Sequence, residues 1–134
     1  MEFNVQKAIY LQIVDYICEN ILIGKWKEGD RIPSVREMAV DIEVNPNTIL
    51  RTYSFLQDRG VIFNQRGIGY FISDKGVENA KNLKKDDFLS HEVPYFIKTM
   101  ELLNLSYDEL VDLYKQKKKW IIIKNNEVAN ENVQ

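Results

Sequence analysis

The chain has 134 residues, of which 45% are apolar and 28% charged, so it suits one compact domain with an appendage and excludes two large domains. Its net charge is −2, so any affinity for nucleic acid has to come from basic side chains gathered on one face rather than from the whole molecule. The two parts of the chain share this balance, because residues 1–75 and 76–134 each carry nine Lys and Arg against ten Asp and Glu.

The N-terminus and the cysteine content bear on where the protein acts. The first residues lack the basic start and apolar core of a signal peptide, and the most apolar region, residues 8–24, is interrupted by Asp15 and Glu19. Cys18 is the only cysteine, so it forms no internal disulfide, and its place on an apolar helix face favours a buried thiol. We therefore expect a cytoplasmic protein with no membrane span.

Apolar residues recur every four positions near the start of the chain. This spacing predicts an amphipathic helix over residues 8–23 with one buried face. The members of that face are Ile9, Ile13, Ile17 and Ile21. Gly24 is well placed to end the helix.

A second, short helix is predicted over residues 35–42. It follows a link that holds a turn signal at Gly29-Asp30 and an extended stretch that ends at Pro33-Ser34. Ser34 and Glu37 have the spacing of a capping box, in which the Ser hydroxyl and the Glu carboxylate each satisfy a backbone N–H group. We therefore expect the helix to begin directly after Ser34.

A third helix is predicted over residues 46–59. Asn45 suits the N-cap, Pro46 suits the first helical position, and Gly60 supplies the left-handed residue that ends the helix. On a helical wheel the inward side consists of Ile49, Thr52, Tyr53 and Leu56, and the outward side of Asn47, Arg51, Ser54 and Asp58. The polar side therefore faces solvent at the helix end that carries partial positive charge.

Two runs of β-forming residues follow the third helix. Residues 61–63 and 70–72 flank residues 65–69, whose glycines allow a tight reversal, so we expect a hairpin over residues 61–73. Helix, helix, turn, helix and hairpin, in this order, are typical of a winged helix-turn-helix domain. The expected fold class is therefore mainly α with a small β-hairpin, and residues 7–75 form that domain.

The rest of the chain predicts a helical region and a tail. Helices are expected over residues 87–103 and 107–118, where Pro94 marks either the start of the first or a kink in it, and Ser106 begins a capping box for the second. The run Trp120–Ile123 fits an edge strand, a cover for the helices or part of an interface. The tail, residues 121–134, is expected to be partly disordered.

The two C-terminal helices carry more apolar surface than they can bury against each other. We expect the same region of a second subunit to cover it, which makes residues 76–120 a dimerisation region. The alternative is packing against the chain's own winged domain. The apolar residues are Phe88, Leu89, Val93, Phe96, Ile97, Met100, Leu103, Leu110, Val111, Leu113 and Tyr114.

Amide, hydroxyl and guanidinium groups gather at the start of the third helix. Asn pairs with adenine and Arg with guanine in the major groove, which admits a helix, so double-stranded DNA is the expected partner. Arg66, followed by Gly67 at the hairpin tip, is a candidate for the phosphate backbone or the minor groove. Arg36 is either a phosphate clamp or an ordinary surface charge. The candidates on the third helix, each with capping or solvation as the alternative, are Asn45, Asn47, Thr48 and Arg51.

Several short motifs, in the right order and at the right distances, closely resemble the DNA-binding domain of GntR-type bacterial transcription regulators. The resemblance covers roughly residues 7–74, and the short helical C-terminal region looks most like the YtrA-like branch. The motifs are Gly24-x4-Gly29-Asp30-Arg31-Ile32-Pro33-Ser34-x-Arg36-Glu37, Val44-Asn45-Pro46-Asn47-Thr48, Gly60-Val61-Ile62 and Gly67-x-Gly69-Tyr70-Phe71-Ile72.

This resemblance implies a homodimeric regulator, expected to be a repressor, that binds an inverted repeat in DNA. One departure concerns Leu50, which stands where many members of the family place an Arg, while the basic side chain here follows at Arg51. The DNA contacts that the resemblance implies are at Arg36, Asn45, Asn47, Thr48, Arg66 and Gly67.

Other classes of function find less support in the sequence. His91 is the only histidine, so it cannot build the multi-histidine metal site that some branches of the family carry. No catalytic nucleophile and base can be paired, no phosphate-binding loop is present and no cofactor is implied. The alternative function is a winged-helix module for protein–protein interaction. A small-molecule effector remains open, and its identity does not follow from the sequence.

Overall fold

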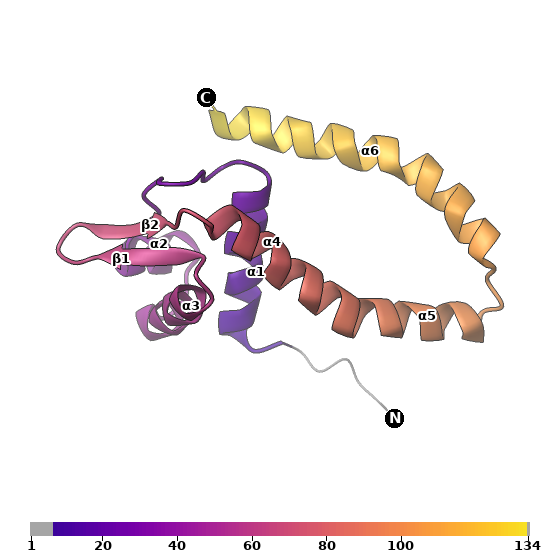
Figure 1. The fold of residues 1–134 in the computed structure, drawn as a ribbon, viewed down its shortest axis with the longest axis horizontal. Helices are drawn as coiled ribbons and strands as arrows, with labels where there is room; N and C mark the ends of the chain where they lie inside the picture. The colour runs from indigo at the N-terminus through magenta and orange to yellow at the C-terminus, as the bar shows by residue number, and fades with distance from the viewer. Residues whose placement is uncertain (1–6, 134) are drawn as a thin grey trace. The chain divides into compact units, whose positions relative to one another are not determined.

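The computed structural model describes residues 7–133, except for the side chains of 123, 125 and 128–133. Its elements (Figure 1) are α1 (Ile9–Leu22), α2 (Val35–Asp41), α3 (Pro46–Asp58), β1 (Ile62–Gln65), β2 (Gly69–Ile72), α4 (Gly76–Asp87), the π-helical turn η1 (Phe88–Glu92), α5 (Val93–Leu102) and α6 (Tyr107–Val133). One compact unit ends at Leu83 and a second begins at Lys84. The first has the element order of a winged helix-turn-helix domain, which confirms the expected fold class.

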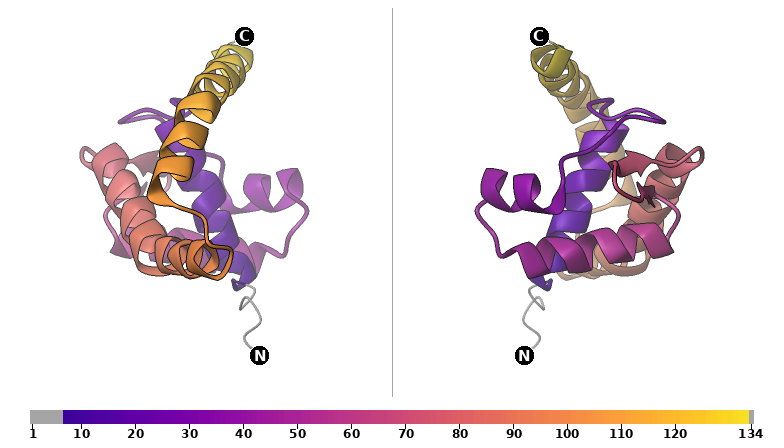
Figure 2. Two further views of the ribbon diagram at one scale, coloured as in Figure 1. Left: turned by 90° about the vertical axis from the view of Figure 1, so that its right-hand side faces the viewer. Right: turned by 90° about the vertical axis from the view of Figure 1, so that its left-hand side faces the viewer.

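The core of the first unit lies where α1, α2 and α3 meet the hairpin. In the right-hand view of Figure 2, α3 crosses α1 near the N-terminal end of α1, and the two helices are in contact. Cys18 is fully buried, as expected, but Ile9 is 60% exposed, so the predicted apolar stripe of α1 is buried only from its second turn onward. The buried residues of α1 and α3 are Ile13, Val14, Ile17, Cys18, Ile21, Ile49, Thr52, Tyr53 and Leu56.

The capping box predicted at the start of α2 is present. The Glu37 N–H donates to the Ser34 Oγ at 3.1 Å, and the Ser34 N–H donates to the Glu37 carboxylate at 3.2 Å, which makes a complete capping box. The backbone N–H of Ser34 and then its hydroxyl lower the pKa of the Glu37 carboxyl group, and the nearby Arg31 lowers this pKa further. The cap therefore stabilises the folded chain while the carboxylate is charged, and this contribution is lost as the pH falls through the lowered pKa.

The hairpin is extended by the segment that precedes α2. The strands pair antiparallel, with Ile62 opposite Ile72 and Gln65 opposite Gly69. Arg31 forms a bridge with Phe71, flanked by hydrogen bonds from the Ile32 N–H to the Tyr70 carbonyl and from the Ile72 N–H to the Asp30 carbonyl, each 2.9 Å. The hairpin is thus tied to the link between α1 and α2 through its second strand.

Tyr53 joins three parts of the first unit. Its side chain is fully buried in α3, and its hydroxyl donates to the Pro33 carbonyl at 2.6 Å. Its ring lies edge-on against Tyr70 of β2, with 4.8 Å between the centroids. Burial raises the pKa of the Tyr53 hydroxyl, which therefore stays protonated and able to donate. Tyr53 therefore connects α3, the link before α2 and the hairpin.

A helix that the sequence did not predict begins at Gly76. Its first turns belong to the winged domain, because Gly76 and Ala80 are buried and the Asn79 side-chain amide donates to the Gly60 carbonyl at 2.9 Å. A Cβ at position 76 would collide with the Val61 carbonyl oxygen. The packing of the domain therefore continues to Leu83, and the boundary expected after residue 75 is too early.

Helix α4 continues through η1 into α5. The range 87–103, which was expected to form one helix, therefore contains the last residue of α4, the π-helical turn η1 and the helix α5. Pro94 cannot donate a hydrogen bond, and in a regular α-helix its ring would meet the carbonyl of Ser90. The turn before it is instead π-helical, with the Val93 N–H bonded to the Phe88 carbonyl. The wider turn accommodates the proline, and α5 begins at Val93.

The last helix is longer than predicted. α6 begins with the expected capping box, in which Ser106 and Glu109 exchange two hydrogen bonds of 3.1 Å. It then runs to Val133, so Trp120–Ile123 is helical rather than an edge strand, and most of the tail expected to be partly disordered, residues 121–133, belongs to this helix. Gln134 lies outside the described residues. No helix in the described part of the chain has both the length and the apolar character needed to cross a membrane.

Replacing Tyr53 with Phe tests the junction at this side chain. The substitution keeps the ring but leaves the Pro33 carbonyl without its donor, so it should lower the free energy of unfolding by about 1–2 kcal/mol. Urea denaturation followed by circular dichroism measures the change. Tyr70→Phe is the control, because no hydrogen bond of the Tyr70 hydroxyl is present among the described residues, and it should cost less. Equal losses would contradict the assigned role of the hydrogen bond.

Gly76→Ala tests whether the first turn of α4 belongs to the winged domain. The new methyl group has to displace the Val61 carbonyl, so the free energy of unfolding should fall by about 1–3 kcal/mol, although Ala is the better helix former. Lys81→Ala, at an exposed position of the same helix, should leave stability nearly unchanged. A stabilised Gly76→Ala variant would show that α4 does not pack against Val61 in solution.

Candidate nucleic-acid interface

The outward face of α3 is polar and exposed, as the helical wheel predicted. All four predicted inward residues are buried, and Thr48 is half-buried at the edge between the two faces. The exposed side chains are Asn47, Arg51, Ser54 and Asp58. The amphipathic pattern therefore places a row of hydrogen-bonding groups on one side of a helix whose other side is fixed in the core.

The two asparagines at the start of α3 do different things. The Asn45 side-chain oxygen accepts a hydrogen bond from the Asn47 N–H at 2.8 Å and so caps the helix. That oxygen is held at the cap, and the Asn45 side-chain N–H groups remain able to donate to a ligand. The Asn47 carboxamide is exposed and makes no hydrogen bond within residues 7–133, so both its donor and its acceptor are open to a ligand.

Arg51 rests on an aromatic ring from another helix. Its guanidinium carbon lies 3.9 Å from the centroid of the Tyr10 ring, in the first turn of α1. Beside them is an open depression of about 350 Å³, bounded by Ala8, Ile9, Tyr10, Asn47, Thr48 and Arg51. The closeness of Tyr10 to Arg51 could not be predicted from the periodicity of apolar residues in the sequence.

Thr52 ties the start of α1 to α3. It is fully buried, and its hydroxyl lies 3.2 Å from the Tyr10 carbonyl and 2.9 Å from the Thr48 carbonyl. The bond to Tyr10 spans two helices, whereas the bond to Thr48 is the common one within a helix. The backbone that carries the Tyr10 ring is therefore held against the inner face of α3.

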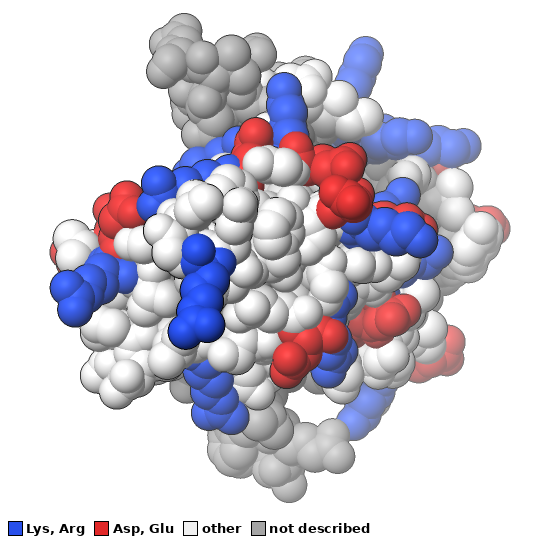
Figure 3. All heavy atoms as spheres, turned by 60° about the vertical axis from the view of Figure 1, so that its left-hand side comes forward, with Lys and Arg blue, Asp and Glu red and all other residues white. Residues whose placement is uncertain are grey.

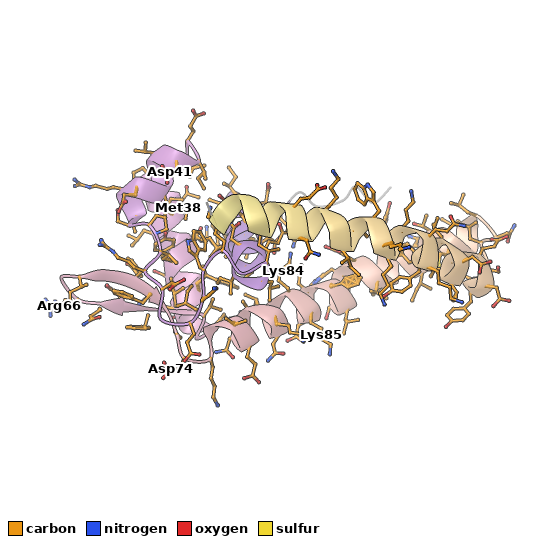
Figure 4. The ribbon with its side chains drawn as sticks, turned by 90° about the horizontal axis from the view of Figure 1, so that it is seen from above. Met38, Asp41, Arg66, Asp74, Lys84 and Lys85 are labelled. Atoms are coloured by element: carbon orange, nitrogen blue, oxygen red, sulfur yellow. The ribbon has the colours of Figure 1, made fainter. Side chains whose placement is uncertain are left out.

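Arg66 and Gly67 lie at the tip of the hairpin. Figure 4 shows Arg66 at the far end of the β1–β2 hairpin. The reversal is closed by a hydrogen bond from the Ile68 N–H to the Gln65 carbonyl at 2.9 Å, and Gly67 has φ +81°, which favours glycine. Nothing lies within 4 Å of the position that a Gly67 Cβ would take, so another molecule can approach the backbone there.

A second arginine, not singled out as a site residue from the sequence, lies along the wing. The Arg31 Nε lies 2.8 Å from the position that a Cβ on Gly69 would occupy, so the absence of a side chain at Gly69 makes room for the guanidinium. Arg31 is exposed and pairs with Phe71 through its backbone. Its place in the motif around Pro33 was visible in the sequence, but its contact with the hairpin was not.

The interface has no broad basic surface. On the face shown in Figure 3, Lys and Arg side chains stand apart among uncharged and acidic ones. Arg36 is exposed in the first turn of α2, while Asp41 lies exposed at the end of the same helix (Figure 4). Individual, directed contacts are therefore better supported than a general attraction to polyanions.

The structure brings no metal ligands together in its described part. No group of three or more His, Cys, Asp or Glu side chains there has the geometry to hold a metal ion. His91 is exposed in η1, where its Nδ1 lies 3.3 Å from a carboxylate oxygen of Asp87.

The second unit has an apolar groove and no core. Among the side chains described from Lys84 onward, none is buried, and Phe96 and Ile97 are 46% and 52% exposed. A groove of about 580 Å³ between α5 and α6 is lined by Phe88, Glu92, Val93, Phe96, Ile97, Met100, Glu101, Leu105, Tyr107 and Leu110. Both Glu residues are exposed at this groove, whose other lining side chains are apolar or aromatic.

The model of the family described as "Bacterial regulatory proteins, gntR family" matches residues 9–72. The uncharacterized transcriptional regulator YhcF of Bacillus subtilis is 43% identical over 112 residues, which are 83% of this chain and 90% of that protein. The transcriptional repressor YtrA of the same organism is 47% identical over 73 residues, 54% of this chain and 53% of its own length.

A solved structure gives the same assignment. The crystal structure of a GntR-family regulator from Bacteroides thetaiotaomicron has a TM-score of 0.68 and 43% identity, and the match covers 84% of this chain and 97% of that one. These relatives are transcription regulators rather than enzymes. The matches to YhcF and to the Bacteroides structure are long enough to extend beyond the winged domain into the helical region. The winged helix-turn-helix fold, its motifs and these relatives together show that the chain belongs to the GntR family of bacterial transcription regulators.

Proposed function

We propose that the protein binds one DNA sequence with the N-terminal half of α3 in the major groove and the β1–β2 hairpin as a wing, and that it represses transcription by occupying a promoter. The observation that carries this proposal is the exposed pair Asn47 and Arg51 at the start of a helix whose opposite face is buried. Similarity to YtrA, which is named a repressor, supports the direction of regulation. Bacterial DNA lies in the cytoplasm, so the proposal implies action there.

Base recognition is divided among few groups. The free Asn47 carboxamide suits a bidentate pair with adenine, and the Arg51 guanidinium suits one with guanine. Asn45, whose oxygen caps α3, remains able to donate its side-chain N–H groups to a phosphate. Thr48, at the edge of the face, is suited to a phosphate or sugar contact.

The remaining candidates act on the DNA backbone. Arg66 at the tip of the wing carries the charge, and Gly67 offers an unobstructed backbone beside it. Arg36, exposed in the first turn of α2, is suited to a phosphate next to the groove that α3 enters. These contacts add affinity on any duplex, because phosphates carry no direct sequence information.

Alanine variants distinguish the side chains that recognise bases from those that bind the DNA backbone. Asn47→Ala and Arg51→Ala should each cost about 1–3 kcal/mol on the preferred duplex and change the base preference at one position. Arg66→Ala should weaken binding to all duplexes alike and reduce its salt dependence. The duplex is first selected from a random library, and affinities are then titrated by fluorescence anisotropy at two salt concentrations.

The exposed residue Gln57, later on α3, provides the control, because Gln57→Ala should leave both affinity and preference unchanged. If Asn47→Ala and Arg51→Ala, like Arg66→Ala, weakened binding equally on selected and random duplexes, base recognition by Asn47 and Arg51 would be contradicted. Failure to select any duplex would instead favour a winged-helix module for protein–protein interaction.

The same proposal includes a homodimer formed through the second unit. Apolar side chains that are all at least partly exposed need a cover, and the groove between α5 and α6 offers a surface that a second copy can fill. A two-fold dimer would present two copies of α3 to an inverted repeat about one helical turn apart.

Charges placed in this groove should separate the subunits. The variant with both Phe96→Asp and Ile97→Asp should be monomeric at micromolar concentration, because burial of two carboxylates against apolar side chains is unfavourable. Size-exclusion chromatography with light scattering measures the mass. Val40→Asp, at a position 77% exposed in α2, is the control and should leave the mass at that of a dimer. A monomeric unmodified protein would refute the dimer proposal.

A further inference from the structure

Four side chains form a row along the edge between α1 and α3, with two aromatic rings between two guanidinium groups. The Arg51 guanidinium lies 3.9 Å from the Tyr10 ring centroid. The Tyr10 ring packs edge-on against Phe55, with 6.1 Å between centroids and 65° between planes. The Arg59 guanidinium lies over the other aromatic member, 4.6 Å from the Phe55 centroid. Tyr10, the one member that comes from α1, is the surface on which Arg51 rests.

The Tyr10 ring is itself held in place from two directions. Its backbone carbonyl lies 3.2 Å from the buried Thr52 hydroxyl, which fixes the first turn of α1 against α3. Its ring is braced by Phe55, which packs against the hydrophobic core. The support under Arg51 is therefore part of the folded domain rather than a mobile surface side chain.

Stacking on a ring leaves the hydrogen-bonding capacity of an arginine intact. The ring covers one face of the guanidinium, whereas all five N–H donors point outward in its plane. In the described residues Arg51 makes no hydrogen bond or ion pair, so these donors are free for the edge of a base. A long side chain fixed before binding also loses less conformational entropy when the complex forms.

We propose that Tyr10 is a positioning residue for base recognition, which fixes the guanidinium plane of Arg51 so that its donors face a guanine in the major groove. This inference rests on the proposed function. It also gives a reason for the position of the arginine. Residue 50 is turned 100° from residue 51 around α3, so an arginine in place of the exposed Leu50 would lie away from the α1 side, out of line with the Tyr10 ring.

Base discrimination in a double-mutant cycle tests this proposal. Arg51→Ala first identifies the base pair at which preference is lost. Tyr10→Leu should reduce discrimination at that same base pair about two- to five-fold, the loss expected for an exposed cation–π contact, and should leave the other base pairs unchanged. In the Arg51→Ala background Tyr10→Leu should have no further effect at that position.

Two variants control for folding and for the hydroxyl group. Tyr10→Phe keeps the ring and should retain full discrimination, and Tyr16→Leu, on an exposed part of α1, should behave like the unmodified protein. A loss of affinity with Tyr10→Leu that is equal at all base pairs, or that persists in the Arg51→Ala background, would overturn the positioning role. A loss of discrimination with Tyr10→Phe would also overturn it, because the hydroxyl would then be the active group.

A measurement without DNA separates this inference from the proposed function. In the free protein the Arg51 side-chain NMR resonances should be shifted upfield by the ring current of Tyr10, a shift that Tyr10→Phe keeps and Tyr10→Leu removes. Unshifted Arg51 resonances in the unmodified protein would refute the stacked arrangement, whatever the protein binds. An unmodified protein with the shift but without base preference would refute the proposed DNA reading and, with it, the positioning role.

Discussion

Burial of one face of α3 is the constraint on which the first unit depends. The inner face packs against α1 and the hairpin, and two of its hydroxyl groups reach other elements. The Tyr53 hydroxyl donates to the Pro33 carbonyl, and the Thr52 hydroxyl lies near the Tyr10 carbonyl as well as the Thr48 carbonyl of its own helix. A buried hydroxyl without a partner is costly, so these bonds fix both the rotation of α3 and its position along α1. Once the inner face is fixed, Asn47 and Arg51 have to face outward.

The wing and the first turns of α4 complete this arrangement from the other side. Arg31 pairs with β2, and Gly76 lets α4 approach the Val61 carbonyl more closely than any residue with a side chain would. Asn79 then satisfies the Gly60 carbonyl at the end of α3. The helix that carries the candidate reading residues is thus held at its start by a cap, along its length by the core, and at its end by α4.

The second unit differs from the first in how its helices can be stabilised. None of its described side chains from Lys84 onward is buried, so the chain alone does not provide it with a core. Helices of this kind gain most of their stability from packing, and the apolar groove between α5 and α6 is the surface that the proposed second copy would cover. Two copies would couple the stability of this unit to assembly, which matches the two-fold symmetry of an inverted repeat.

The sequence by itself determined the local structure of the first unit: three helices, their caps at Ser34 and Asn45, the hairpin and the polar face of α3. Each is set by periodicity or by residues within a few positions of one another. Only the tertiary structure decided that Tyr10 lies under Arg51, that Arg31 follows the wing and that α4 begins at Gly76. Such contacts join residues distant in sequence, so no local pattern predicts them. The Lys-, Asp- and Asn-rich stretch after Gly76 gave no local signal for α4, because this helix is held by long-range packing and by the hydrogen bond of the Asn79 amide.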